Sequence, residues 1–134
     1  MFKAKLAAFA GALILAGSAF AAQDECPNLS DLQTEGVSMA QPFFGSYFTY
    51  HFSKYNTDSS WGLVIANLNV ESEEEAIELG NEILNNMTAP GVYTPLETDI
   101  MCTYETGVPG VFAATIKYEF PSPMKLKQFI QKAH

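Results

Sequence analysis

The chain has 134 residues with 15 acidic side chains, seven lysines and no arginine, and its formal net charge is −8. Nucleic acids and anionic membranes bind proteins through clustered basic side chains, and bidentate recognition of phosphate favours arginine. The composition therefore argues against nucleic acid and anionic lipid as partners. The length is sufficient for one small domain with a single hydrophobic core.

The first 22 residues have the pattern of a secretory signal peptide. Lys3 and Lys5 give a basic start, residues 6–16 form an apolar run, and Ala19 and Ala21 supply the small residues of a cleavage site within residues 18–21. The apolar run is too short to span a bilayer comfortably. We expect residues 1–21 to be removed, with a cut after Ala22 as the alternative. Residues 22–134 would then form one secreted or periplasmic bacterial domain that has no membrane attachment.

Cys26 and Cys102 are the only cysteines in the chain. An oxidising compartment favours a disulfide between them, and the alternative is a pair of buried free thiols. In the chain-entropy model, a link across so long a loop stabilises a fold by roughly 4 kcal/mol. Cys26 is not preceded by the small apolar residues of a lipoprotein signal, so we expect no lipid anchor.

The N-terminal half of the exported part reads as a helix followed by two strands. Residues 27–36 predict a short helix, in which Pro27 suits the first turn and Gly36 suits a left-handed cap. Residues 37–41 predict a short edge strand and residues 44–55 a longer one. Alternation along the longer strand separates a core face from a half-solvated face. The core set is Phe44, Phe48, Tyr50 and Phe52, and the half-solvated set is Tyr47, Thr49, His51, Ser53 and Tyr55.

The clearest helix comes after a third strand. A nearly continuous apolar strand is expected over residues 61–70, in a hairpin with the preceding strand. Residues 72–87 predict a helix because Ser72 and Glu75 form a capping box ahead of an apolar stripe. Gly80 lies in that stripe, although glycine costs about 1 kcal/mol relative to alanine within a helix. Close approach of the helix to the sheet would explain this glycine.

Two further strands are expected at residues 100–105 and 111–120, and residues 124–134 form either a short amphipathic helix or a frayed tail. Apart from the short edge strand, the order of elements is α-β-β-α-β-β. This order predicts an α+β fold with an antiparallel sheet of about four strands and helices packed on one face. The hairpins determine neighbouring strands but leave the overall strand order open.

His51 is the only histidine before the C-terminal His134, and Tyr47 and Tyr55 lie four residues to either side of it. All three belong to one face of the expected strand. An imidazole among aromatic rings can bind haem, another planar ligand or a sugar ring, so these residues form the candidate ligand site. The alternative is an ordinary polar residue on a solvated strand face. A lone histidine supplies at most one imidazole ligand to haem iron.

No motif for catalysis or metal binding stands out. The acidic run at residues 71–82 lacks the glycine-containing loop of calcium sites. A hydrolase would depend on His51 as its only internal base, and a disulfide would remove Cys102 as a nucleophile. We assign no catalytic or metal-binding residue and expect no enzymatic activity. The methionines lack metal-ligand spacing and are expected to pack in the core: Met39, Met87, Met101 and Met124.

A set of spaced residues gives the chain a family resemblance: Cys26-Pro27, Leu29, Leu32, Gly36, Trp61 at the start of a strand, Glu75-Ala76 in a helix, Cys102-x-Tyr104 and Ala113-Ala114. In these features the chain resembles a family of small secreted proteins from gamma-proteobacterial intracellular pathogens. Most members have no known function, and some carry a hemin-binding label. The resemblance implies haem as a ligand to test, without implying which residues would bind it.

These observations give three hypotheses, in order of preference. The first is an exported, non-enzymatic protein that binds a small ligand, such as haem, or a protein partner. The second is a cell-surface or host-directed interaction protein that uses exposed aromatic residues around positions 47–55. The third is a small hydrolase.

Overall fold

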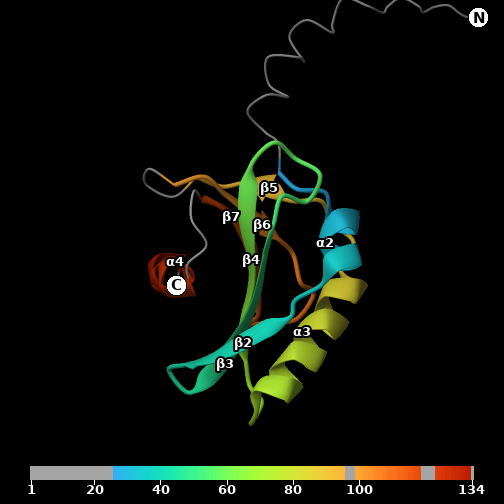
Figure 1. Cartoon of the computed structure of the whole chain (residues 1–134). Coiled ribbons are helices and arrows are strands. Elements are labelled where there is room, and N and C mark those ends of the chain that lie inside the picture. The colour runs from blue at the N-terminus through green and yellow to red at the C-terminus, as the bar shows by residue number, and fades with distance from the viewer. Residues whose placement is uncertain (1–25, 96–98, 119–122, 134) are drawn as a thin grey trace, which may run out of the picture.

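The computed structural model describes residues 26–95, 99–118 and 123–133 (Figure 1). The expected signal peptide and its cleavage site lie outside these residues, as do the last two residues of the strand expected at 111–120. The elements in chain order are α2 (Leu29–Glu35), β2 (Met39–Phe43), β3 (Ser46–Ser53), β4 (Ser60–Leu68), α3 (Glu73–Asn86), β5 (Val92–Tyr93), β6 (Met101–Tyr104), β7 (Phe112–Tyr118) and α4 (Pro123–Ala133).

The strands form one six-stranded antiparallel sheet with the order β2-β3-β4-β7-β6-β5. The α+β class and the antiparallel pairing are as expected, but the strand count and the order of elements were wrong. The short β2 is a full member of the sheet, and β5 lies between the helix expected at 72–87 and the strand expected at 100–105, where no strand was expected. The element order among the described residues is α-β-β-β-α-β-β-β-α. A two-residue strand such as β5 is too short for sequence periodicity to reveal.

Helices cover both faces of the sheet, so the expectation that they pack on one face was wrong. Figure 1 shows α2 and α3 on one side of the sheet and α4 on the other. Buried residues accordingly form two clusters, of which the second contains Leu126, Phe129 and Ile130 from α4. The continuous apolar run in β4 explains this arrangement, because a strand that is apolar on both faces requires a cover on each.

The two faces of β3 differ from the expectation in the same way. Phe48 and Tyr50 are buried beneath α4, as expected for core residues. On the opposite face, which was expected to be half-solvated, Thr49 is fully inaccessible because α3 packs over it. Phe44 was placed in the core by alternation, but it lies in the turn before β3 and is 81% exposed.

The start of α3 confirms Ser72 as the cap of this helix, but the Glu75 side chain bonds the residue before the cap and not the Ser72 amide, as a capping box requires. Ser72 is the N-cap, and its Oγ accepts a hydrogen bond from the Glu75 amide at 3.1 Å. The Glu75 carboxylate accepts the Glu71 amide at 2.9 Å. Gly80 is required for packing, because a β-carbon there would lie 2.8 Å from the Thr49 hydroxyl oxygen. The close approach that the sequence suggested is therefore present between α3 and β3.

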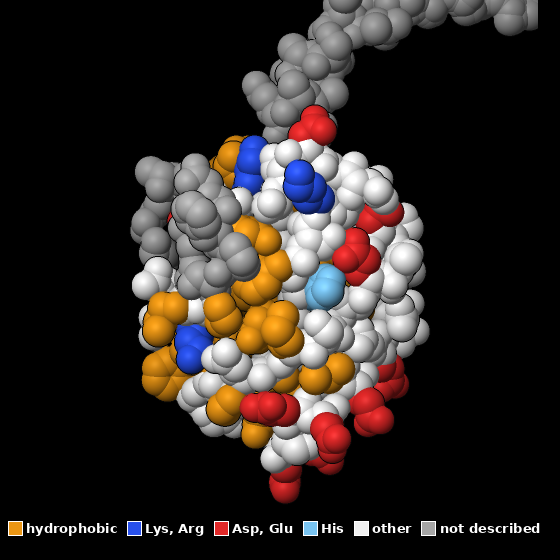
Figure 2. Space-filling model, viewed as in Figure 1, with side chains coloured by type: hydrophobic (Ala, Val, Ile, Leu, Met, Phe, Trp, Pro, Cys, Tyr) orange, Lys and Arg blue, Asp and Glu red, His pale blue; other side chains and the backbone are white. Residues whose placement is uncertain are grey.

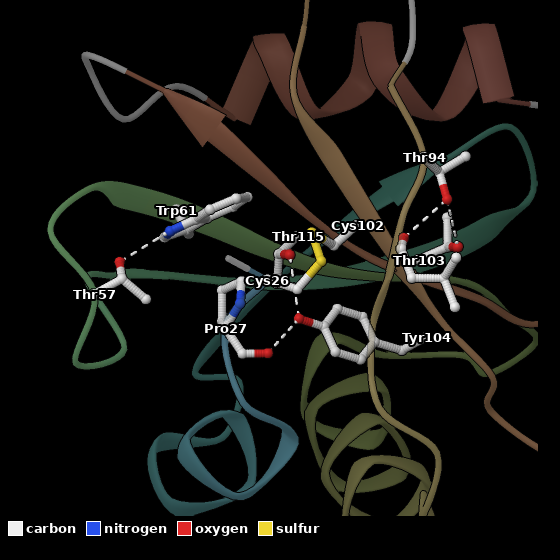
Figure 3. Close-up of a disulfide and its surroundings, with 10 residues drawn as sticks. Cys26, Pro27, Thr57, Trp61, Thr94, Cys102, Thr103, Tyr104 and Thr115 are labelled. Atoms are coloured by element: carbon white, nitrogen blue, oxygen red, sulfur yellow. Dashed lines mark hydrogen bonds between the residues drawn. A yellow bond between two sulfur atoms is a disulfide. The ribbon is translucent and has the colours of Figure 1, made fainter. Parts of the chain in front are cut away.

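The disulfide between Cys26 and Cys102 is present, with the two α-carbons 5.9 Å apart (Figure 3). It joins the segment before α2 to β6. Next to it the Tyr104 hydroxyl donates a 2.7 Å hydrogen bond to the Pro27 carbonyl, as Figure 3 shows. Helix α2 begins at Leu29, after an Asn28 N-cap, so Pro27 lies before the helix and not in its first turn. No helix among the described residues is long and apolar enough to span a membrane.

Candidate functional site

The ring of His51 has a hydrogen-bonding partner on each nitrogen. Nε2 lies 3.1 Å from the Glu35 carboxylate, and Nδ1 lies 3.1 Å from the Ser38 hydroxyl. Because a carboxylate only accepts, Nε2 is the donor in the bond to Glu35, whereas Nδ1 and the Ser38 hydroxyl can each take either role. The second Glu35 oxygen accepts the Ser53 hydroxyl at 2.8 Å. The network therefore fastens the C-terminal end of α2 to β3.

The order of groups in this network is that of a serine, histidine and carboxylate relay. Sequence reasoning missed it because the three residues come from the end of α2, the α2–β2 connection and β3, which meet only in the folded protein. A serine nucleophile also requires donors for the oxyanion. The two nearest backbone donors have other partners, since the Val37 amide donates to Asn81 and the Ser38 amide donates to the Tyr50 carbonyl. The arrangement thus favours a structural role for the network.

Tyr55 lies beside His51 but is directed into the core. Its side chain is buried, its hydroxyl donates to the His51 carbonyl at 3.4 Å, and the two ring centroids are 6.3 Å apart. Burial, followed by the negative charge of Glu35, raises the pKa of the Tyr55 hydroxyl well above its usual range. A phenolate ligand at this position is therefore strongly disfavoured.

Tyr47 lies near the opposite end of β3, where it pairs with Pro42 of β2 and Leu68 of β4. Four residues of strand separate it from His51, which corresponds to about 13 Å. The structure therefore brings together His51 and Tyr55 but not Tyr47. A haem iron at His51 would find both ring nitrogens engaged, so the observed network does not fit axial ligation without a rearrangement.

The methionines divide into two groups. Met87 and Met101 are buried packing residues, as expected, whereas Met39 and Met124 are exposed. Among the described residues, no group of three or more histidine, cysteine or acidic side chains is arranged to hold a metal ion.

An open groove of about 670 Å³ lies at the β2–β3 turn, and none of its described lining residues belongs to the His51 network. Its walls come from four segments: the turn at residues 44–46, the end of β4 at residues 67–69, one side of α3, and the β6–β7 connection at residues 106–111. Leu68 and Ile83 are buried at its base and belong to the core beneath α3. Among the described residues of the lining, Glu82 is the only charged one. The groove thus combines an apolar base with a weakly acidic wall.

Phe44 stands on the rim of this groove in an unfavourable conformation. Phe43 and Ser46 pair across the hairpin, which leaves a two-residue turn of Phe44 and Gly45 with φ angles of 51° and 82°. Turns with two positive φ angles favour Asn-Gly, and a bulky residue in this region is strained. The ring is also 81% exposed, although it contacts Phe43 with centroids 4.6 Å apart. A Phe-Gly pair between two β-prone runs is the sequence signal that could have identified this turn.

Hydrogen bonds hold the opposite wall of the groove in place. The Thr106 hydroxyl accepts the Val108 amide at 3.1 Å and lies 3.2 Å from the Val111 carbonyl. The Asn67 side-chain amide donates to the Gly110 carbonyl at 3.0 Å, which ties the end of β4 to this connection. These contacts pre-form the groove, as is usual for ligand sites.

The sequence profile of a family described as Domain of unknown function (DUF4949) matches residues 25–129. The chain belongs to this family. The match extends from the residue before Cys26 to Phe129 in α4, so both the His51 network and the groove of this DUF4949 domain lie within it. Searches of curated proteins and of solved structures found no match. The resemblance to a family of unknown function is therefore confirmed at the level of the DUF4949 family.

Proposed function

We propose that this DUF4949 domain is an exported, non-enzymatic binding protein and that its ligand or partner occupies the groove beside Phe44. The signal-peptide pattern and the Cys26–Cys102 disulfide support export to an oxidising compartment. Binding at the groove is supported chiefly by one observation, which is the exposed and strained Phe44 on its rim.

Folding gives no reason for a phenylalanine at position 44. Its ring gains little burial, and its positive φ angle costs of order 1 kcal/mol compared with residues that tolerate this conformation. Exposed apolar side chains and backbone strain both concentrate at binding sites. The same ring would become a buried anchor once a ligand covered it.

The size and lining of the groove agree with this role. Its volume of about 670 Å³ falls within the range of small-molecule sites, and its lining mixes apolar and amide side chains. A pre-formed wall lowers the entropy lost on binding. Ligands with an apolar group flanked by polar atoms therefore suit it best.

Titration with Nile red, an uncharged apolar dye, tests this proposal. We expect a saturable rise in fluorescence that Phe44→Asn reduces at least about tenfold in affinity. Val92→Ser is the matched control, because Val92 is 60% exposed in β5 and does not line the groove. An absence of dye binding, or equal losses in both variants, would contradict the proposal.

Haem is the ligand that the family resemblance suggests, and hemin is the second probe. The favourable observation is a half-buried His51 beside an aromatic ring, and the unfavourable one is its two hydrogen bonds. A saturable Soret shift that disappears in His51→Ala and persists in Phe44→Asn would assign hemin to His51 and count against the groove. A flat hemin titration together with Nile red binding supports the groove.

A further inference from the structure

We infer that the occupant of the groove is a basic peptide segment of a partner protein, in which an apolar side chain lies next to lysine or arginine. This inference rests on the proposed function, because it names the partner class of the same groove. It is carried by the charge around the groove, by the apolar surface at its rim and by the amide side chains that line it.

The wall formed by α3 carries negative charge that has no described counter-charge. Glu82 lines the groove, and Glu78 lies one turn earlier on the same side of the helix. Three further glutamates occupy the first turn of α3, and the last turn contains no basic residue. Figure 2 shows acidic side chains gathered over the lower part of the molecule, where α3 lies in Figure 1. Such a surface attracts cationic partners.

Lysines do not neutralise this wall within the described part of the chain. None of the residues that line the groove is basic, and no lysine whose side chain is described forms an ion pair with the glutamates of α3. Among the described residues, therefore, no lysine neutralises the charge of Glu78 and Glu82. Phosphate-rich or carboxylate-rich ligands would be repelled by the same wall.

Apolar contact is offered on the other side of the groove. Phe44 projects from the turn, and Val108 and Pro109 lie in the β6–β7 connection opposite. An exposed phenylalanine ring can cover an apolar side chain and also contact a lysine or arginine through its face. A partner segment with an apolar side chain next to a basic one would contact the apolar rim and the acidic wall at the same time.

Amide side chains favour a peptide over a simple cationic amphiphile. Asn69 and Asn86 line the groove, and the side-chain carbonyl of an asparagine can accept a hydrogen bond from a peptide backbone. A peptide can form hydrogen bonds with such groups, and a hydrocarbon chain cannot. The groove is also open rather than enclosed, which allows a chain to pass through it.

Calorimetric titration with three matched peptides tests this inference. The probes are acetyl-Gly-Lys-Phe-Lys-Phe-Lys-Gly-amide and the same peptide with glutamate or serine in place of lysine. We expect the lysine peptide to bind at least about tenfold more tightly than the serine peptide, with the glutamate peptide weakest. Added salt should reduce this preference.

Variants of the acidic wall supply the second arm. Glu82→Gln should weaken binding of the lysine peptide about threefold, the size of one exposed ion pair, and leave the serine peptide unchanged. Asp58→Asn is the control, because Asp58 is an exposed acidic residue in the β3–β4 connection that does not line the groove. It should alter neither affinity.

The outcomes separate this inference from the proposed function. Equal affinities for the lysine and glutamate peptides, both dependent on Phe44, would overturn the basic partner and leave the groove function standing. Binding of dodecylammonium without binding of the lysine peptide would identify a small amphiphile and overturn the peptide. If neither the peptides nor Nile red bind, both proposals are wrong.

Discussion

Around α2, His51 and Tyr55, which the sequence suggested as site residues, form hydrogen bonds within the fold, whereas Phe44 at the groove is largely exposed to solvent. His51 has hydrogen-bonding partners on both ring nitrogens, and the hydroxyls of Tyr55 and Tyr104 donate to backbone carbonyls. Phe44 shares a positive φ angle with Tyr55, but Tyr55 is buried whereas Phe44 is 81% exposed. A residue type that is rare in the sequence, such as histidine here, is therefore weaker evidence of a binding site than a side chain that contributes little to folding.

The same comparison assigns different roles to the two regions. Side chains around α2 stabilise the fold, so changing them should lower the free energy of unfolding and leave ligand binding intact. Changing Phe44 should have the opposite pattern.

Loss of the disulfide should have the largest effect. In the variant Cys26→Ser with Cys102→Ser, the unfolded chain is no longer constrained across 76 residues. We expect the free energy of unfolding in urea to fall by about 4 kcal/mol. Nile red should still bind the folded fraction, measured at low temperature or in a stabilising osmolyte. If molecules that remain folded no longer bound the dye, the region around α2 and the groove would not be independent.

Alkaline pH should have the second-largest effect on stability, through the region around α2. Burial raises the pKa of Tyr104 to about 12, from a usual value of 10.0. Below pH 10 both the folded and unfolded states hold this proton; above it the unfolded state ionises first, so stability falls until the folded pKa is reached. The loss attributable to Tyr104 should be about 2 to 3 kcal/mol between pH 10 and pH 12.

Tyr104→Phe provides the control for this pH dependence. At neutral pH it should cost about 1 kcal/mol, because the hydrogen bond to the Pro27 carbonyl is lost. Between pH 10 and pH 12 its stability should fall less steeply than that of the parent. Parallel curves of unfolding free energy against pH would show that Tyr104 is not responsible.

Replacement of His51 is expected to have a smaller effect. His51→Ala removes the hydrogen bonds to Ser38 and Glu35, and we expect a loss of about 1.5 kcal/mol by chemical denaturation. Ser30→Ala, at an exposed position on α2, should be neutral. Nile red affinity should not change in either variant. A His51 variant that is as stable as the parent would mean that the network does not hold α2.

Phe44→Asn should raise stability while it removes ligand binding. The substitution creates Asn-Gly in a turn with two positive φ angles, which should raise the free energy of unfolding by about 1 kcal/mol. Gly45→Ala is the opposing control and should lower stability by about 1 kcal/mol, because the φ angle of 82° disfavours a β-carbon. A destabilised Phe44→Asn would show that the ring is needed for folding.

Local sequence was sufficient to predict the start of α3 and the positions of the main strands. The Ser72–Glu75 cap depends on residues three apart, and the strand at β4 depends on a continuous apolar run. The disulfide could be predicted from two cysteines and an expected compartment, and the structure confirms it. The candidate site could not be predicted, because its four walls are separated by up to about 60 residues of sequence and meet only through long-range packing.

Burial of both faces of the sheet likewise depends on tertiary packing. Alternation along β3 correctly separated Phe48 from Thr49, but it could not show that α3 covers one face while α4 covers the other. Periodicity records which residues share a face and carries no information about what covers it. For the same reason, alternation assigned Phe44 to the core, although this residue lies in the β2–β3 turn and not in β3.

The sequence by itself determined the antiparallel α+β class, the cap of α3 and the single possible cysteine pair, because these depend on residue type and, for the cap, on short spacing. Only the tertiary structure decided that Ser38 and Glu35 flank His51, that α4 closes the second face, and that a groove opens beside Phe44. Those features arise from strand register and helix packing, which bring together residues that no local pattern connects.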